Sequence, residues 1–420
     1  MNSSLTVLGH GSLDWGIVAV FATVYLGMFL GGLPKLRLDR TGVALLGAIA
    51  VIPLTGWSVT EAAQTVDLPT IVLLFAFMVV AAQMRLGGFF GAVTRGVGAL
   101  PWSGPMLLGA LIAVSAALSA VFSNDVVCLA VTPVVVALCR QRALPPLPFL
   151  IGLACAANIG SAATLIGNPQ NMLIGSMLKL DFGDHLLRAL GPVLLSLGLL
   201  WVWLVHGAGR AGWAARAPAG LAAEAGPPFD AWQTAKGLAV AAVLMGVFLA
   251  TDFPRELAAL IGAGVLLLSR RLHSAEVMGF VDWSLLLLFM GLFVVNHAFQ
   301  TTGLAAEAVA WAATLGLHLH EPGTLTVVSV VLSNLVSNVP AVMLLLPHLG
   351  PNPQEAGLLL ALVSTLAGNL LLVGSIANLI VVDLAAKQGV AIDWRQHLRL
   401  AAPAALGSLG VTVAWLGLTR

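Results

Sequence analysis

The sequence predicts an all-α polytopic membrane protein with about ten transmembrane helices and two re-entrant hairpins, arranged as an inverted-topology repeat. Three observations carry this prediction. Of the 420 residues, 59% are hydrophobic and only 9% are charged, whereas soluble domains carry charge at about 25% of positions. One long apolar segment has a polar centre, and the second half of the chain repeats the order of the first.

The polar centre is Ser123-Asn124-Asp125, inside the apolar segment from Met106 to Cys139. Asp125 is the one charged residue in these 34 positions. One membrane crossing needs ~20 residues and two need ~40 with a turn, so we expect a hairpin of two half-helices that meet inside the membrane. An ordinary loop between two short spans is the alternative, and it leaves little room for two complete crossings.

Helix ends would give the tip of this hairpin its chemistry. The first half-helix should end near Phe122 and leave carbonyl groups with partial negative charge. The second should begin at Asn124 or Asp125, which are both good N-cap residues, with free N–H groups and partial positive charge. The tip therefore offers oxygen atoms to a cation and amide donors to an anion.

Apolar segments place the other elements in order. In the first half we expect spans at 15–33, 41–57, 68–84, 147–178 (interrupted) and 187–206, an interfacial stretch at 87–100 and the hairpin at 104–139. In the second half we expect spans at 232–250, 256–269, 283–299, 355–386 (interrupted) and 400–418, an interfacial stretch up to 317 and a second hairpin at 323–349. No basic segment precedes the first span, so we expect this span to be retained.

Matching residues indicate that the two halves are duplicates. The residues matched at a shift of 214 positions are Leu118, Ser119, Ser123, Asn124 and Pro133 with Leu332, Ser333, Ser337, Asn338 and Pro347. Each half has five crossings, which is an odd number, so the second half should lie upside down relative to the first. The expected divisions are a first repeat at 1–206, an Ala/Gly/Pro-rich cytoplasmic linker at 207–231 and a second repeat at 232–420.

The positions of the basic residues support the inversion. If the N-terminus lies outside, 15 of the 19 Lys and Arg residues fall on cytoplasmic segments and 4 on outer ones. This is the distribution that the positive-inside rule requires. We therefore expect an integral protein of a bacterial-type inner (plasma) membrane, surrounded by lipid, with its N-terminus outside.

The interrupted spans should face the two hairpin tips at mid-depth. Their Gly, Asn and Pro residues break the helix and expose backbone groups, which is tolerated there only beside protein or a water-filled cavity. For any single Asn or Ser, helix packing is the alternative explanation. The candidate substrate- and ion-binding residues are Ser123, Asn124, Asp125, Asn158, Gly160, Ser161, Thr164, Gly167, Asn168, Asn171, Ser337, Asn338, Asn369, Gly374, Ser375 and Asn378.

These motifs resemble those of the ion transporter superfamily, which includes arsenite permeases, sodium/proton antiporters of the same branch, the melanosomal P protein, divalent anion/sodium symporters and citrate-transporter-like proteins. The resemblance covers nearly the whole chain, and its specific parts are the two Ser-Asn tips, the Gly-Asn-Pro-Gln-Asn break at 167–171 and the Asn residues at 369 and 378. In the divalent anion symporters both tips read Ser-Asn-Thr. Here Asp125 and Val339 replace the threonines, which is more similar to the arsenite-permease and antiporter branch. The resemblance implies an elevator-type mechanism and a homodimer.

Asp125 has three possible roles. With Ser123, Asn124 and Gly167 it could bind Na⁺ as a fixed carboxylate. It could instead carry the coupling proton, because a charge at bilayer depth is costly, by ~2.5–3.5 kcal/mol on insertion scales. In the third role it is merely an N-cap. We expect Asp67 and Asp282, which precede equivalent spans, to be caps.

The function expected from these features is secondary active transport of a small anion or oxyanion, of arsenite type or a carboxylate, coupled to H⁺ or Na⁺. A sodium/proton antiporter without an anion substrate is the alternative within the same fold. Metalloprotease, nucleophile-elbow and phosphate-loop motifs are missing from the sequence, which disfavours a membrane-embedded enzyme and an ATP-driven pump acting alone; a passive channel and a partner ATPase stay open. A net charge of +1 disfavours nucleic acid as a partner. We expect no cofactor, and Cys128, Cys139 and Cys155 show no metal-ligand spacing.

Overall fold

The structure is a computed structural model that describes residues 11–33, 36–207 and 228–419. The first half contains α1 (Ser12–Leu30), α2 (Arg40–Thr55), α3 (Val59–Gln64), α4 (Leu68–Leu86), α5 (Phe89–Ala99), α6 (Gly104–Phe122), α7 (Asn124–Gln141), α8 (Pro146–Ser161), α9 (Pro169–Met177) and α10 (Phe182–Gly207). The linker expected at 207–231 falls almost entirely outside the described residues.

The second half follows the same order. It contains α12 (Ala231–Ala250), α13 (Arg255–Leu267), α14 (Ser274–Met278), α15 (Trp283–Thr301), α16 (Leu304–Thr314), α17 (Pro322–Val336), α18 (Asn338–Leu345), α19 (Pro353–Ala367), α20 (Ile376–Lys387) and α21 (Trp394–Leu418), with 3₁₀ turns at Leu346–His348 and Leu372–Gly374. Even the short helices α3 and α14, which the sequence did not predict, occupy the same place in each half. The element order thus supports the duplication.

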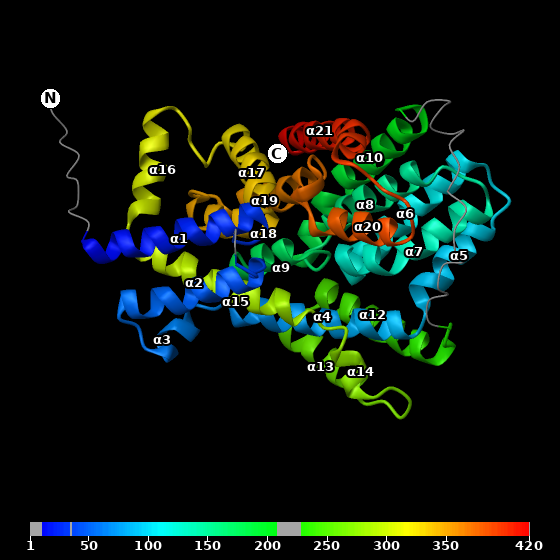
Figure 1. The fold of residues 1–420 in the computed structure, drawn as a ribbon, viewed down its shortest axis with the longest axis horizontal. Helices are drawn as coiled ribbons and strands as arrows, with labels where there is room; N and C mark the ends of the chain where they lie inside the picture. Colours follow the sequence, from blue (N-terminus) through cyan, green and yellow to red (C-terminus); the bar gives the residue numbers. More distant parts are fainter. Residues whose placement is uncertain (1–10, 34–35, 208–227, 420) are drawn as a thin grey trace. The chain divides into compact units, whose positions relative to one another are not determined.

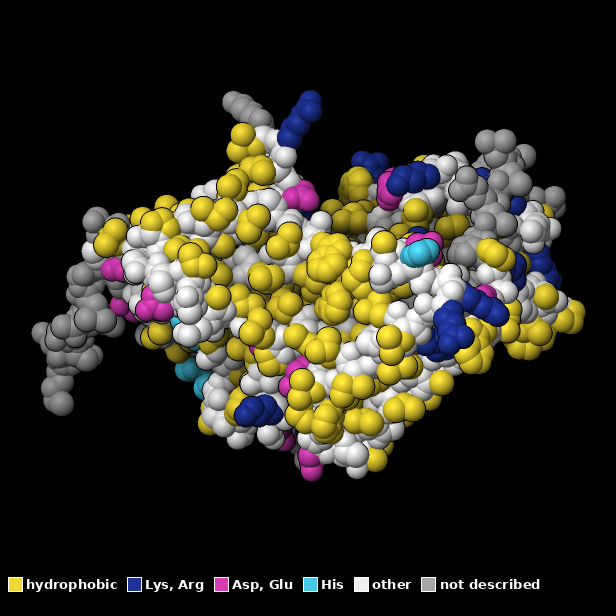
Figure 2. Space-filling view, turned by 90° about the horizontal axis from the view of Figure 1, so that it is seen from below, with side chains coloured by type: hydrophobic (Ala, Val, Ile, Leu, Met, Phe, Trp, Pro, Cys, Tyr) yellow, Lys and Arg dark blue, Asp and Glu magenta, His cyan; other side chains and the backbone are white. Residues whose placement is uncertain are grey.

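The predicted all-α membrane fold is confirmed. Within the described residues, eight helices are long and apolar enough to cross a membrane, namely α1, α4, α6, α7, α10, α12, α15 and α21. Several shorter helices are also apolar, among them α2, α8, α17 and α19. Figure 2 shows hydrophobic side chains spread over most of one face, with charged side chains sparse between them. The chain is an integral membrane protein.

The helices group into two compact units. The first lies within residues 1–71 and 283–319 and so combines α1, α2 and α3 with α15 and α16 of the second half. Here Tyr25 donates a hydrogen bond to Asn296 Oδ1 at 2.8 Å, and Phe21 stacks on Phe299 with ring centroids 3.9 Å apart. Gly291 lets α15 approach α2, since a Cβ there would lie 2.9 Å from the Ala44 backbone.

The second unit, within residues 72–282 and 320–420, contains both hairpins and both interrupted spans. Helix α8 is buried along its whole length and packs closely on α6, because a Cβ on Gly160 would lie 2.3 Å from Ala116 Cα. Figure 1 shows α6, α7 and α8 next to one another in this unit.

The first hairpin consists of α6 and α7, joined by the single residue Ser123. Its arms of 19 and 18 residues are longer than the expected half-helices. The tip nevertheless lies inside the unit, since Phe122 and Asn124 on either side of it are buried. The second hairpin is shorter, because α18 has 8 residues before it tightens into a 3₁₀ turn.

The break between α8 and α9 follows from local sequence. Asn168 is the N-cap of α9, and its side chain accepts a hydrogen bond from the Asn171 backbone at 2.9 Å. Pro169 stands at the first helical position, where its missing N–H costs nothing. The other break, between α19 and α20, begins at Gly368 and ends at Ser375, which precedes α20 without a side-chain cap bond.

Candidate functional site

The two hairpin tips share an unusual backbone conformation. Ser123 has φ 70° and Ser337 has φ 75°, a left-handed region that non-glycine residues rarely adopt. Each serine is the whole connection between two helices. The same strained residue type at both tips is expected of a duplicated element, and strain of this kind concentrates at functional sites.

The first tip is bonded to the α8–α9 break. The backbone N–H of Asn124 donates to the Gly167 carbonyl at 3.1 Å, and Asn124 Nδ2 donates to Asn158 Oδ1 at 2.8 Å. Gly167 is required here, since a Cβ would lie 2.2 Å from the Ser161 carbonyl oxygen. The expected meeting of hairpin tip and broken span therefore occurs in the first repeat.

Asn158 connects the two repeats. Its Oδ1 accepts hydrogen bonds from Asn124 Nδ2 and from Ser375 Oγ, the latter at 3.1 Å. Its Nδ2 donates to Asn369 Oδ1 at 2.7 Å and to Asn378 Oδ1 at 3.4 Å. Asn158 is completely buried, so one side chain joins the first tip to the break of the second repeat.

A second polar cluster lies at the start of α9. Asn168 Nδ2 donates to Ser161 Oγ at 2.9 Å and to Thr365 Oγ1 at 3.3 Å. Thr365 Oγ1 also accepts from Gln170 Nε2 at 3.1 Å and donates to the Ala361 carbonyl at 2.8 Å, with Asn171 Oδ1 as a more distant acceptor at 3.4 Å. The sequence analysis did not single out Thr365, which lies within the regular part of α19 and carries no break signal.

The second tip is less completely bonded than the first. Asn338 is buried, but its Oδ1 has no hydrogen-bond partner among the described residues. It packs against the second break, since a Cβ on Gly368 would lie 3.0 Å from Asn338 Nδ2. Gly374 is held close to Asn334, whose Oδ1 accepts from the Leu371 backbone at 3.3 Å.

Asp125 lies one residue beyond the buried tip, on a half-buried position of α7. Its carboxylate makes no hydrogen bond or ion pair with any described residue. The N-cap of α7 is Ser123, so capping does not explain Asp125. By contrast, Asp67 accepts from the backbone and hydroxyl of Thr70 at 3.4 and 3.1 Å, as a cap should.

Other candidates from the sequence have packing roles in this conformation. Thr164 Oγ1 donates to the Ala120 carbonyl at 2.6 Å and fastens the break to α6. Ser161 Oγ donates to the Asn158 carbonyl at 2.8 Å, and Gly160 permits the close approach of α6 and α8. These residues shape the site, and their polar atoms are already engaged.

Two buried histidines escaped the sequence analysis. His185, near the start of α10, places Nε2 3.1 Å from the Ala162 carbonyl, just past the end of α8. His397, near the start of α21, places Nε2 3.2 Å from the Asn369 carbonyl, just past the end of α19. The last helix of each repeat thus braces that repeat's broken span in the same way.

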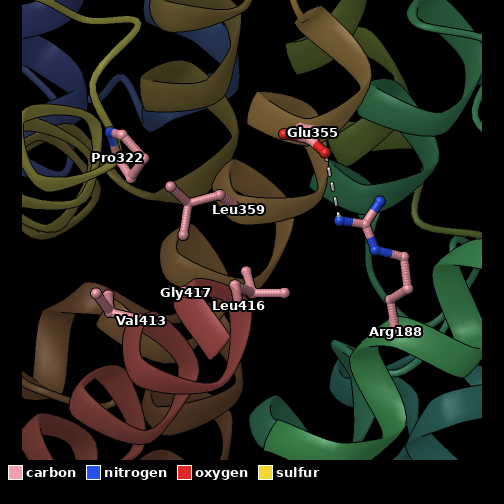
Figure 3. A pocket seen from close by; sticks show the side chains of 7 residues that line it. All are labelled: Arg188, Pro322, Glu355, Leu359, Val413, Leu416 and Gly417. Carbon is pink, nitrogen blue, oxygen red and sulfur yellow. Dashed lines mark ion pairs between the residues drawn. The ribbon is translucent and has the colours of Figure 1, made fainter. Parts of the chain in front are cut away.

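A separate cavity of about 130 Å³ lies among the ends of α10, α17, α19 and α21. Figure 3 shows Arg188 and Glu355 facing each other across it, with Leu359 and Leu416 on its wall. The guanidinium and carboxylate are 4.0 Å apart and partly exposed. Among the described residues, no hydrogen bond links this ion pair to the asparagine network.

Comparisons with known proteins agree with this architecture. The family model described as citrate transporter (CitMHS) matches residues 17–367. The silicon efflux transporter LSI3 of Oryza sativa subsp. japonica is 30% identical over 99% of both chains, and the inner membrane protein YbiR of Escherichia coli K12 is 33% identical over 79% of this chain and 83% of its own. The solved YdaH transporter of Alcanivorax borkumensis has the same fold, with a TM-score of 0.62 at 15% identity over 97% of both chains. The family and LSI3 are named as transporters, not enzymes, and this chain is a membrane transporter of the CitMHS citrate transporter family.

Proposed function

We propose that the protein is a secondary active transporter of a small hydroxylated oxo-acid of arsenite type, which binds at the asparagine network around Asn158. The observation that carries this proposal is the junction itself. A single buried amide joins one hairpin tip to the break of the other repeat. Sites built from broken helices at a repeat interface are typical of alternating-access transporters.

The chemistry of the network favours a hydroxylated solute over a citrate-like polycarboxylate. Carboxamides and hydroxyls both donate and accept hydrogen bonds, which matches a solute whose hydroxyl groups do the same. No Lys or Arg among the described residues bonds to Asn124, Asn158 or Asn369. The nearest formal charge along the chain is the carboxylate of Asp125, which would repel an anion. A relative named for silicon efflux supports the same class of solute, because dissolved silicon is a neutral hydroxide.

We assign the coupling ion to Asp125 and the first tip. A carboxylate without a partner beside two helix ends can bind a proton, or bind Na⁺ together with Ser123, Asn124 and the Gly167 carbonyl. Asp125→Asn should abolish coupled uptake and leave folding intact. Asp383→Asn is the matched control, since Asp383 is exposed and forms an ion pair with Lys387 one turn away. Coupled uptake that survives in Asp125→Asn would remove Asp125 from the mechanism.

Orientation and movement are part of the proposal. The distribution of basic residues supports an N-terminus outside, in a bacterial-type inner membrane. The resemblance to the ion transporter superfamily supports an elevator-type movement of a homodimer. Crosslinking between two copies of the chain tests the homodimer. Labelling of single cysteines placed at the chain ends tests the side of the membrane on which the N-terminus lies.

Uptake into proteoliposomes tests the function directly. Arsenite, silicic acid, citrate and succinate should be compared under an imposed pH or Na⁺ gradient, with metalloid content measured by mass spectrometry. We expect gradient-driven, saturable uptake of arsenite or silicic acid, and its loss in Asn158→Leu but not in the exposed control Asn352→Ala. Uptake of citrate alone would refute the assignment of the solute.

A sodium/proton antiporter is the second candidate, and the unpartnered carboxylate of Asp125 favours it. In this case Na⁺ alone should dissipate a pH gradient across the vesicle membrane. Neither arsenite nor silicic acid should then change the rate. The same vesicles, loaded with a pH-sensitive dye, distinguish the two candidates.

A further inference from the structure

Two buried thiols lie beside the asparagine network, and the proposed function uses neither. Cys128 and Cys155 are both free and completely enclosed. They lie 27 positions apart in the chain, a spacing that does not correspond to any metal-ligand motif in the sequence. Cys139 is equally buried but lies three turns further along α7.

Helix geometry places the two thiols opposite each other. Helix α7 runs away from the tip and α8 runs toward the break, so the two helices are antiparallel around the Asn124–Asn158 hydrogen bond. Cys128 follows Asn124 by four residues, about 6 Å along α7, and Cys155 precedes Asn158 by three, about 4.5 Å along α8. Both shifts point in the same direction and keep the same helix face. The two helices also pack directly against each other.

We propose that Cys128 and Cys155 form a dithiol site for a trivalent arsenical, one turn from the asparagine network. Two thiols condense with As(OH)₃ to give (Cys-S)₂As–OH and two water molecules. Two As–O bonds break, two As–S bonds form, each thiol proton leaves with a hydroxide, and arsenic stays trivalent. Soft thiol sulfur is the ligand that soft metals and metalloids prefer.

The number of ligands favours the metalloid over Zn²⁺. The described residues hold no group of three His, Cys, Asp or Glu side chains arranged to bind a metal, whereas tetrahedral zinc sites take three or four protein ligands. A trivalent arsenical needs only the two thiols and keeps its remaining hydroxyl. That hydroxyl would face the direction of Asn124 and Asn158, whose amides can bond to it.

The site does not depend on which solute the protein transports. Binding is measured on the purified protein without any gradient, so a transporter of silicic acid alone could still hold arsenic here. The thiols become accessible when the network opens to water, and the arsenical should therefore react slowly but to a defined end point.

The test is intact-protein mass spectrometry of the full chain in detergent after incubation with arsenite, and separately with phenylarsine oxide. We expect one arsenic per chain in the wild type and in the control Cys139→Ala, and none in Cys128→Ala or Cys155→Ala. X-ray absorption at the arsenic edge should show two sulfur neighbours. If either alanine variant fails to fold, Cys128→Ser and Cys155→Ser replace it, with size-exclusion elution as the check.

The proposal is overturned if the folded wild type takes up no arsenic, or if the double variant Cys128→Ser/Cys155→Ser binds as much as the wild type. It is also overturned if Cys139→Ala alone removes the adduct. A single sulfur neighbour at the arsenic edge would likewise exclude the dithiol site.

Discussion

Replacing Asn158 by alanine should destabilise the protein by about 2–5 kcal/mol. The side chain makes four hydrogen bonds, at 2.8, 3.1, 2.7 and 3.4 Å. Interhelical hydrogen bonds in membrane proteins contribute ~0.6 kcal/mol each on average, which gives a lower figure of about 2 kcal/mol. The upper figure applies if one buried partner is left unsatisfied, since that adds ~1–3 kcal/mol.

The measurement is equilibrium unfolding of the purified protein in mixed detergent micelles, followed by tryptophan fluorescence. Asn352→Ala is the control, since Asn352 is exposed and its side chain does not cap α19. Asn158→Asp sharpens the test, because it keeps one acceptor but sets a second carboxylate oxygen against Asn369 Oδ1. An Asn158→Ala protein that unfolds within ~0.5 kcal/mol of the wild type would show that the network does not hold the repeats together.

Three further substitutions test other parts of the structure. Gly160→Ala should cost ~1–3 kcal/mol because its Cβ would lie 2.3 Å from the α6 backbone, while Gly246→Ala, with open space around it, should be neutral or stabilising; equal stability of the two would refute the close packing. Hydrogen bonds from the capping serine lower the pKa of Glu61, so the α3 cap is complete above the unfolded-state pKa and is lost as pH falls through the lowered value. Amide exchange in α3 should therefore rise on acidification, and Glu61→Gln should remove this dependence. Glu355→Gln should change stability by less than ~1 kcal/mol, because the pair with Arg188 is 4.0 Å long and half-exposed; a larger loss in thermal unfolding would contradict this.

The sequence could predict the broken spans because the signals for them are local. Asn168 and Pro169 start α9 through their own backbone preferences, although α8 ends earlier, at Ser161. The positions of the two hairpin tips followed from the repeated Ser-Asn pair in the same way. The effect of each of these residues is on backbone only a few positions away, so the sequence alone contains the information.

The partners of these residues could not be predicted, because they come from distant parts of the chain. Asn158 bonds to residues 34, 211 and 220 positions away. Thr365 stands inside a regular helix, and His185 and His397 look like ordinary residues near helix starts. Periodicity places such side chains on a helix face, but it does not say which helix packs there.

The sequence also could not show how the two halves exchange helices. α15 belongs to the second repeat, yet it packs with α1 and α2 of the first. Such helices carry apolar residues on all faces, so their sequences have almost no hydrophobic periodicity that would indicate which face packs on a neighbour. Small residues such as Gly47 and Gly291 determine which helices pack together, because they allow a neighbouring helix to approach closely.

The two tips share a backbone but differ in their hydrogen bonds, and this difference predicts opposite responses to the same substitution. Asn124 donates to Asn158 and Gly167, whereas Asn338 Oδ1 has no partner among the described residues. Removing a buried acceptor that has no partner can be neutral or stabilising, while removing one side of a bonded pair leaves the other unsatisfied at ~1–3 kcal/mol. Asn338→Leu should therefore leave the unfolding free energy unchanged or raise it and weaken solute binding, and Asn124→Leu should lower it. Equal destabilisation by the two substitutions would mean that Asn338 already bonds to a structural partner and is not available to bind a ligand.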